Sequence, residues 1–144
     1  MHQLRRTATA LLAVTALLGG GVATATSASA ALAQCNNHDI REGNLGVPAY
    51  VSGSTIVRSC YLQSGSRNYA VQLLQDALRN CYGQGIAVDG SFGPATRAAL
   101  VNVQRHHGIA ADGSFGPQTR NTINFAGYAN GSGALFCLPA RTKA

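Results

Sequence analysis

The sequence contains one phrase twice, as VDGSFGPATRAAL at residues 88–100 and as ADGSFGPQTRNTI at residues 111–123. Eight positions of the phrase are identical, and the tripeptide GIA precedes both copies. Identities that recur in register indicate an internal repeat, which has to be recognised before other features are interpreted. We therefore expect a fold in which one structural unit is built twice.

Each copy predicts a tight turn followed by a helix. An Asp-Gly pair favours a turn, because glycine can take a positive φ and the aspartate oxygen can accept nearby backbone N–H groups. The phenylalanine that follows is expected to anchor the turn in the core. The Gly-Pro pair predicts a helix start, since proline suits the first helical position. The motif residues are Gly90, Phe92, Gly93 and Thr96 in the first copy, and Gly113, Phe115, Gly116 and Thr119 in the second.

A further helix is predicted before the repeat, because Val71, Leu74 and Leu78 fall on one helical stripe. The helices of the two repeats are expected to end at Gly108 and Gly127. Helices of this length are marginal alone, so they should pack around one small core. The sequence therefore predicts an all-α fold, a small three-helix domain with a repeated turn-helix unit.

The chain divides into four predicted parts. Residues 1–33 have the layout of a secretory signal peptide: two arginines, an apolar run and then small residues. The apolar run is too short to cross a bilayer, which takes about 20 residues. Residues 34–65 are a polar, turn-rich arm, extended and able to form short strands. Residues 66–127 are the three-helix domain, and residues 128–144 are a tail.

Signal cleavage is expected after Ala33, with Ala30 as the competing site. Without Arg5 and Arg6, the exported chain carries nine basic and five acidic residues, a net charge of +4. This moderate charge favours an anionic partner without identifying one. Nucleic acid is not expected as a partner, because the arginines are scattered and the protein is exported.

Four cysteines remain after cleavage, and an even number in a small exported chain predicts two disulfides. None of them has the Cys-x-x-Cys spacing of a zinc site, so no metal is expected. One disulfide should staple the arm, which has little core of its own, and the other should tie the tail to the first helix. The predicted pairs are Cys35–Cys60 and Cys81–Cys137.

The sequence resembles the peptidoglycan-binding domain 1 family over about residues 66–125. The family pattern is V-x-x-L-Q-x-x-L, then D-G-x-F-G-x-x-T, then F-Q, then G-L-x-x-D-G-x-x-G-x-x-T. The resemblance implies a three-helix fold and non-catalytic attachment to cell-wall peptidoglycan. One departure is Val103, where the family often has phenylalanine. The matching residues are Val71, Leu74, Gln75, Leu78, Asp89, Gly90, Phe92, Gly93, Thr96, Gln104, Gly108, Ile109, Asp112, Gly113, Gly116 and Thr119.

Four residues of the two repeats are candidate ligand contacts: Asp89, Asp112, Arg97 and Arg120. Of these, the two arginines point to a ligand. Each follows a helix start, where a positive charge is mildly unfavourable against the helix dipole. A helix N-terminus beside an arginine is a natural carboxylate site, and the stem peptides of peptidoglycan offer carboxylates. Alternatively, each arginine is solvated or clamps a turn aspartate, Asp89 or Asp112. Gln75 and Gln104 either contact a ligand or, as we favour, bond the backbone of a neighbouring loop.

No catalytic set is predicted. Glycoside cleavage needs two convergent carboxylates, and of the five acids of the exported chain Asp89 and Asp112 are better explained by their turns. We expect a secreted, monomeric protein of the extracellular space or cell wall that binds the glycan or stem peptide of peptidoglycan without a cofactor. The alternatives are a small peptidoglycan hydrolase and an accessory or inhibitory partner of a wall hydrolase.

Overall fold

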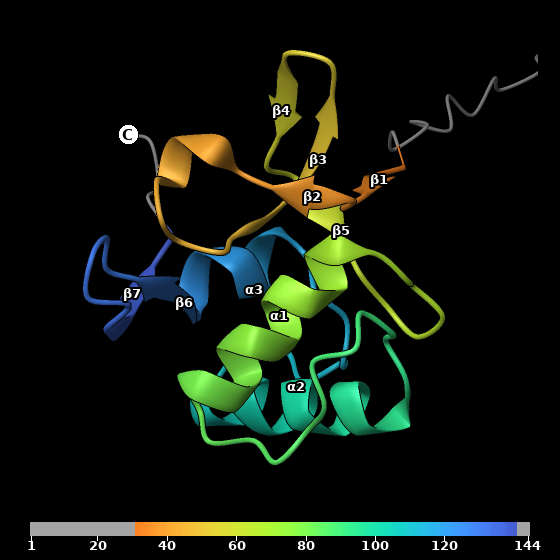
Figure 1. The fold of residues 1–144 in the computed structure, drawn as a ribbon. Helices are drawn as coiled ribbons and strands as arrows, with labels where there is room; N and C mark the ends of the chain where they lie inside the picture. Colours follow the sequence, from red (N-terminus) through yellow and green to blue (C-terminus); the bar gives the residue numbers. More distant parts are fainter. Residues whose placement is uncertain (1–30, 141–144) are drawn as a thin grey trace, which may run out of the picture.

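The computed structural model describes residues 31–140. Residues 1–30 of the predicted signal peptide lie outside the described residues, as do residues 141–144 of the tail. Figure 1 shows the helices packed below an arm of short strands, with a hairpin at one side. The helices in the described part are α1 (Tyr69–Asn80), α2 (Pro94–His106) and α3 (Pro117–Thr122).

The all-α prediction is wrong, because both the arm and the tail form strands. The arm contains an antiparallel sheet in the order β2–β3–β4 and a parallel pair of β1 with β5. The tail folds back as the antiparallel hairpin of β6 and β7. A short 3-10 helix, η1 (Ile40–Glu42), follows β2. The strands are β1 (Ala33–Gln34), β2 (Asn37–His38), β3 (Pro48–Ser52), β4 (Thr55–Val57), β5 (Cys60–Tyr61), β6 (Asn124–Tyr128) and β7 (Leu135–Pro139).

The third helix ends at Thr122 instead of near Gly127. The residues that follow are poor helix formers, among them β-branched Ile123 and the glycine itself. Gly127 lies against the ring of Phe136 in β7, where a Cβ atom would clash. Pairing with β7 uses this close approach and buries Phe125 completely. The tail therefore replaces the last part of the predicted helix with a strand.

Helix α1 forms because its apolar residues share one face. The Asn68 side chain caps its start, accepting from the backbone N–H of Val71 at 3.1 Å. Val71, Leu74 and Leu78 are completely buried. Burying a leucine side chain contributes about 1.5–3 kcal/mol, so this face holds the helix to the core. Beyond the helix, Gly83 reverses the chain with a φ of +64°.

A glutamine of α1 binds the first repeated turn. The Nε2 atom of Gln75 donates to Oδ1 of Asp89 at 2.9 Å and to the carbonyl oxygen of Ser91 at 3.0 Å. It also donates to the hydroxyl of Thr96 at 3.0 Å. The Oε1 atom accepts from the backbone N–H of Asp89 at 3.0 Å and of Gly90 at 2.8 Å. One buried side chain thus holds both the turn and the start of α2.

Gln104 of α2 holds the second turn in the same manner. Its Nε2 atom donates to Oδ1 of Asp112 at 3.1 Å and to the carbonyl oxygen of Ser114 at 2.9 Å. Thr119 is again the third acceptor, and the Oε1 atom accepts from Gly113 N–H at 2.9 Å. The glutamines therefore have the loop-binding role that the sequence analysis favoured.

The segment of residues 62–68, which itself contains a turn closed by the hydrogen bond from Ser66 N–H to the carbonyl oxygen of Gln63, contacts both repeated turns. Leu62 and Phe115 exchange two backbone hydrogen bonds, at 2.8 and 2.9 Å. The N–H of Phe92 donates to the carbonyl oxygen of Ser66 at 2.9 Å. Both phenylalanine rings are buried, with exposed fractions of 2% for Phe92 and 0% for Phe115. The repeated turn therefore brings two helices to one segment, with a ring as anchor each time.

The structure contains both predicted disulfides. Cys35–Cys60 closes a sequence separation of 25 residues in the arm, and Cys81–Cys137 closes 56 residues between the end of α1 and β7. Chain-entropy arguments give each crosslink roughly 3–4 kcal/mol. This is a large contribution for a small domain, whose net stability is typically about 5–15 kcal/mol.

Tyr82 connects the end of α1 with α2 and β6. Its hydroxyl accepts from the backbone N–H of Asn124 at 2.6 Å and lies 2.9 Å from Nε2 of His107. The hydroxyl can therefore donate its own hydrogen to a neutral imidazole. Burial lowers the pKa of His107 below its ordinary value of 6.5, and the neighbouring His106 lowers it further. Burial likewise raises the pKa of Tyr82.

We expect the protein to lose stability between about pH 7.5 and about pH 5, in part through His107. Since the pKa of His107 is lowered in the folded protein, the unfolded chain binds this proton first as the pH falls. The contribution is present above the ordinary pKa of 6.5 and is lost as the pH falls through the folded-state pKa. Thermal unfolding of wild type and His107→Gln across this range measures the effect. His107→Gln should lose less stability than wild type. His106→Gln should fall between the two, because it removes the neighbouring charge that helps to lower the pKa of His107. Equal losses in wild type and His107→Gln would contradict the prediction.

Candidate functional site

Helix α2 places Arg97 on the surface. Its Nη2 atom donates to the carbonyl oxygen of Asp112 at 3.0 Å. Its aliphatic part packs on Gly113, where a Cβ atom would lie only 2.7 Å from Cγ of Arg97. Arg97 of the first repeat thus clamps the turn of the second. The contact is made with the backbone carbonyl of Asp112, one of the turn aspartates that the sequence analysis named as the alternative partner.

The matching arginine of the second repeat is buried. Arg120 has an exposed fraction of 2%. Its Nη2 atom lies 2.9 Å from Oε1 of Glu42 and 3.4 Å from Oδ2 of Asp39. The Nε atom of Arg58 also contacts the Asp39 carboxylate. Because both acids belong to the arm, Arg120 holds the arm against α3.

This arrangement corrects the expectation that Arg97 and Arg120 face wall carboxylates from one side. The arm folds over α3 and surrounds Arg120 with acids, while Arg97 stays at the surface. The repeat itself gave no indication of this difference, since the two arginines occupy the same position in identical phrases. Arg120 is therefore not available to a ligand, and any carboxylate would meet Arg97 alone.

Asp89 and Asp112 are exposed, but each carboxylate shapes its own turn. Their Oδ1 atoms accept from the backbone N–H of Ser91 and of Ser114, at 2.8 Å in both turns. The bond from Ser91, followed by the bond from Gln75, lowers the pKa of Asp89. Of the four predicted ligand residues, the structure joins only Arg97 and Asp112, through the Asp112 backbone.

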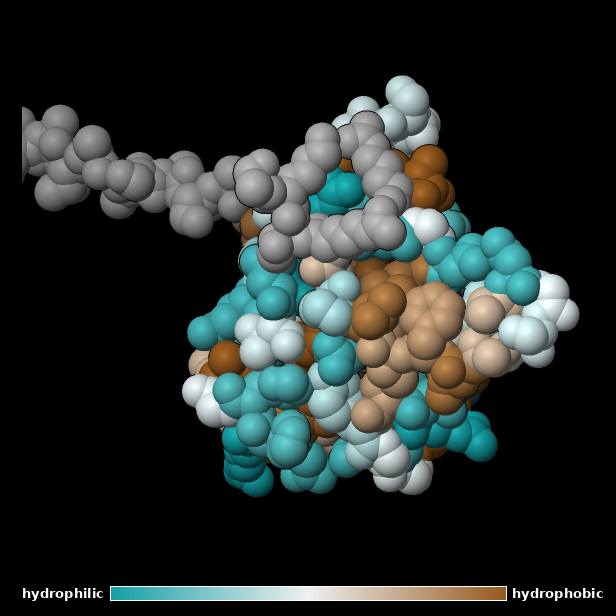
Figure 2. Space-filling model, turned by 90° about the vertical axis from the view of Figure 1, so that its left-hand side faces the viewer, coloured by the Kyte–Doolittle hydropathy of each residue, from teal (hydrophilic) through white to brown (hydrophobic). Residues whose placement is uncertain are grey.

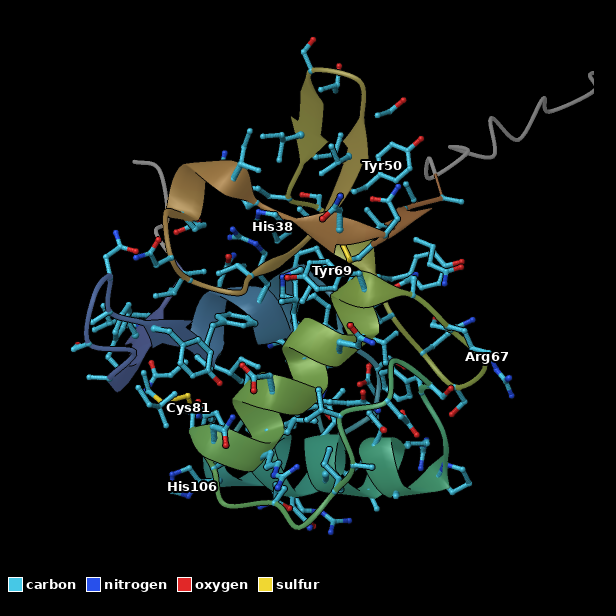
Figure 3. The ribbon with its side chains drawn as sticks, viewed as in Figure 1. His38, Tyr50, Arg67, Tyr69, Cys81 and His106 are labelled. Carbon is cyan, nitrogen blue, oxygen red and sulfur yellow. A yellow bond between two sulfur atoms is a disulfide. The ribbon has the colours of Figure 1, made fainter. Side chains whose placement is uncertain are left out.

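A groove of about 400 Å³ follows the face of α1 that points away from the core. Tyr69, Gln72, Leu73 and Asp76 supply this face, at the i, i+3, i+4 and i+7 spacing of one helical side. Figure 3 shows Tyr69 at the start of α1 beside His38 of β2. The other lining residues are Gly43, Asn44, Leu45, Gly46, Val88, Ala126 and Tyr128.

The walls of the groove come from the arm and the hairpin. The N–H of Gly46 donates to the carbonyl oxygen of Ala126 at 2.9 Å, which joins residues 43–46 of the arm to β6. Gly46 also lies close to α1, since a Cβ atom there would be 3.0 Å from Cδ2 of Leu73. The groove thus exists only because arm, helix and hairpin meet at this point.

Two exposed tyrosines mark the groove, with exposed fractions of 49% for Tyr69 and 46% for Tyr128. The Tyr69 ring meets His38 edge to face, with ring centroids 6.0 Å apart. The Tyr128 hydroxyl donates to the carboxylate of Asp76, 3.1 and 3.2 Å from its two oxygens. Asn80 also donates to Asp76, at 2.6 Å. Burial, followed by the bond to Asp76, raises the pKa of Tyr128.

A second hollow of about 370 Å³ adjoins the groove and shares Tyr69 and Gln72 with it. Arg67 and Asp89 also line this hollow. The two hollows together form one surface that crosses the first turn of α1, with Tyr69 between them. The surface offers aromatic faces, amide and hydroxyl groups and, at its far end, one guanidinium.

The sequence analysis did not single out this groove. Tyr69, Gln72 and Asp76 form a polar and aromatic stripe opposite the apolar stripe of the same helix, which is a signal that periodicity could have given. His38 and Tyr128 had no such signal, because only the packing of the arm and hairpin on α1 brings them to the groove.

The family model for a peptidoglycan binding domain matches residues 67–123. This segment belongs to that family. The peptidoglycan-binding domain thus includes α1, both repeated turns and α3, and it ends directly before β6. It supplies the helical face of the groove. His38, residues 43–46 and Tyr128 lie outside the domain, so the walls of the groove are additions to it.

Several solved structures are similar to part of the chain. A fused zinc-dependent amidase/peptidase with a peptidoglycan-binding domain, from Clostridium acetobutylicum, is 43% identical over 44% of this chain and 28% of its own length, with a TM-score of 0.42. The SleB N-terminal domain is 34% identical, over 43% and 85%, with a TM-score of 0.41. A peptidoglycan-binding protein from Clostridioides difficile is 28% identical, over 58% and 51%, with a TM-score of 0.44. A comparison with curated proteins gives no significant match.

The helices of residues 31–140 are too short or too polar to cross a bilayer. Within the same residues, His, Cys, Asp and Glu side chains do not gather in groups of three or more that could hold a metal ion.

Proposed function

We propose that the protein is exported and binds the peptidoglycan of bacterial cell walls without cleaving it. The family match over residues 67–123 carries this proposal. The predicted signal peptide and the two disulfides support export, since disulfides persist in oxidising compartments. The protein works outside the cytoplasm as a monomer, by itself or beside a wall hydrolase.

The groove along α1 is the surface that this proposal assigns to the wall. Binding sites are typically concave and mostly apolar, with a few polar groups that fix orientation. Here Leu73, Val88 and Ala126 supply apolar surface, and Gln72 and Asp76 supply polar groups. The helical face of the groove belongs to the peptidoglycan-binding domain itself, which links its position to the family match.

The acid of the groove supports a binding role. Among the described residues that line the groove, Asp76 is the one carboxylate. Glycoside cleavage typically uses a pair of carboxylates on opposite sides of the bond. Asp76 is instead bonded to Tyr128 and Asn80, so its place in the groove is to fix these two side chains.

We expect the purified protein to sediment with isolated cell-wall sacculi and to leave them intact. Sedimentation measures binding, and wall turbidity together with the release of soluble muropeptides measures cleavage. Muropeptide release should equal that of a sample without protein, because the groove offers one carboxylate. Protein that stays in solution would contradict wall binding, and release above the control would contradict a non-catalytic role.

A further inference from the structure

This inference rests on the proposed function and names the part of the wall that is bound. We propose that the groove along α1 takes the sugar rings of the glycan strand, and that the stem-peptide carboxylates are not its ligand.

The charge of the groove does not suit an anion. Among its described lining residues, arginine and lysine are absent, and Asp76 carries a negative charge. A carboxylate placed in the groove would be repelled by Asp76. Arg120 is buried with the acids of the arm, and Arg97 of α2 clamps the second turn. Arg67 lines the adjoining hollow together with Asp89 and is not among the residues that line the groove. An uncharged ligand avoids this repulsion.

The surface of the groove suits a sugar. A pyranose ring has apolar C–H faces and a rim of hydroxyl and acetamido groups. Tyr69 and Tyr128 offer half-exposed aromatic faces on which the C–H faces of a sugar can stack. Gln72 and Asn44 offer amide groups to the hydroxyl and acetamido groups, and each amide can both donate and accept. Asp76 accepts hydrogen bonds and so also suits hydroxyl donors.

The spacing of the tyrosines suits a disaccharide. Seven residues of helix separate Tyr69 from Asp76, a rise of roughly 10 Å. Because the Tyr128 hydroxyl is bonded to Asp76, the second ring stands at that end of the groove. Two sugar units of a glycan strand span about this length. One ring can therefore stack at each end, with Gln72 between them.

The groove is also ordered before a ligand arrives. Tyr128 is held by Asp76, and Tyr69 meets His38. The Gly46–Ala126 hydrogen bond fixes the wall between arm and hairpin. Ordering these groups in advance lowers the entropy lost on binding, which favours a weakly interacting neutral ligand such as a sugar.

The test titrates the purified protein with an N-acetylglucosamine tetramer and, separately, with a free stem peptide, by calorimetry. We expect the tetramer to bind and the peptide not to bind. Tyr69→Ala should weaken tetramer binding by ~10-fold or more, as truncated tyrosine anchors do. Tyr69→Phe keeps the ring and should stay within ~3-fold of wild type, since that factor is well under 1 kcal/mol. Arg97→Ala is the charge control and should leave binding unchanged.

Salt gives a second readout. Binding of a neutral sugar should not respond to ionic strength, whereas binding of a carboxylate by an exposed arginine is weakened by screening.

Failure of the protein to sediment with sacculi would contradict the proposed function itself. Sacculus binding that the stem peptide competes away, while the tetramer does not, would overturn only the present inference. Tetramer binding that survives Tyr69→Ala unchanged would also overturn it.

Discussion

Replacing Arg120 with alanine is expected to destabilise the protein by about 3–5 kcal/mol, the usual result of removing one member of a buried ion pair. Its Nη2 atom lies 2.9 Å from Glu42 and 3.4 Å from Asp39, and all three side chains are at most 3% exposed. The substitution leaves two buried carboxylates with one cation fewer. Arg58 contacts the same acids, but its side chain is 26% exposed, and it cannot replace the missing charge from its own position.

Arg97→Ala is the matched control, because Arg97 occupies the same position of the first repeat and is exposed. Exposed charged side chains contribute about 0–1 kcal/mol, so this variant should unfold close to wild type. Chemical denaturation of both variants measures the difference. If Arg120→Ala were as stable as Arg97→Ala, the cluster of Arg120 with Asp39 and Glu42 would not hold the arm.

Gln75→Ala is expected to cost about 3–4 kcal/mol, because each buried polar group left without a partner costs about 1–3 kcal/mol. The side chain is 1% exposed and accepts from two backbone N–H groups, those of Asp89 and Gly90. It also donates to Thr96 at the start of α2. The variant therefore loosens the turn and the helix together.

Gln104→Ala should cost about 1 kcal/mol less than Gln75→Ala, because the Oε1 atom of Gln104 accepts from the backbone N–H of Gly113, whereas that of Gln75 accepts from two backbone N–H groups. Gln118→Ala, on the exposed side of α3, is the control and should change stability by less than about 0.5 kcal/mol. The comparison is made by urea unfolding of the three variants. Equal stability of Gln75→Ala and Gln118→Ala would show that the first turn does not depend on its glutamine.

The elements that local sequence determines were predicted well. The Asp-Gly turns, the buried rings of Phe92 and Phe115, and the helix starts at Pro94 and Pro117 all follow from residues within a few positions of one another. The same is true of the apolar face of α1. Both disulfides were also predicted, since each cysteine had one partner that would restrain a segment with little core.

The elements that depend on distant segments were missed. Strand β6 forms in place of helix because β7 returns from the tail and brings Phe136 over Gly127. Arg120 is buried because Asp39 and Glu42 fold over it from the arm, which the repeat could not reveal. The groove was missed for the same reason, since two of its walls come from segments outside the peptidoglycan-binding domain. Figure 2 shows apolar residues gathered on one face of the molecule. The tail hairpin also exposes apolar side chains, those of Leu135 and Leu138 in β7.

The contacts between arm and domain have a practical meaning for anyone who wishes to use this protein as a wall-targeting tag. Residues 67–123, which match the family model, should not be used alone as a tag. A fragment of these residues would lack Asp39 and Glu42, the acids that contact Arg120. It would also lack the Cys35–Cys60 disulfide, the partner of Cys81, and Gly46 beside α1. A reporter fusion that keeps the groove would have to carry the chain from before Cys35 to beyond Cys137.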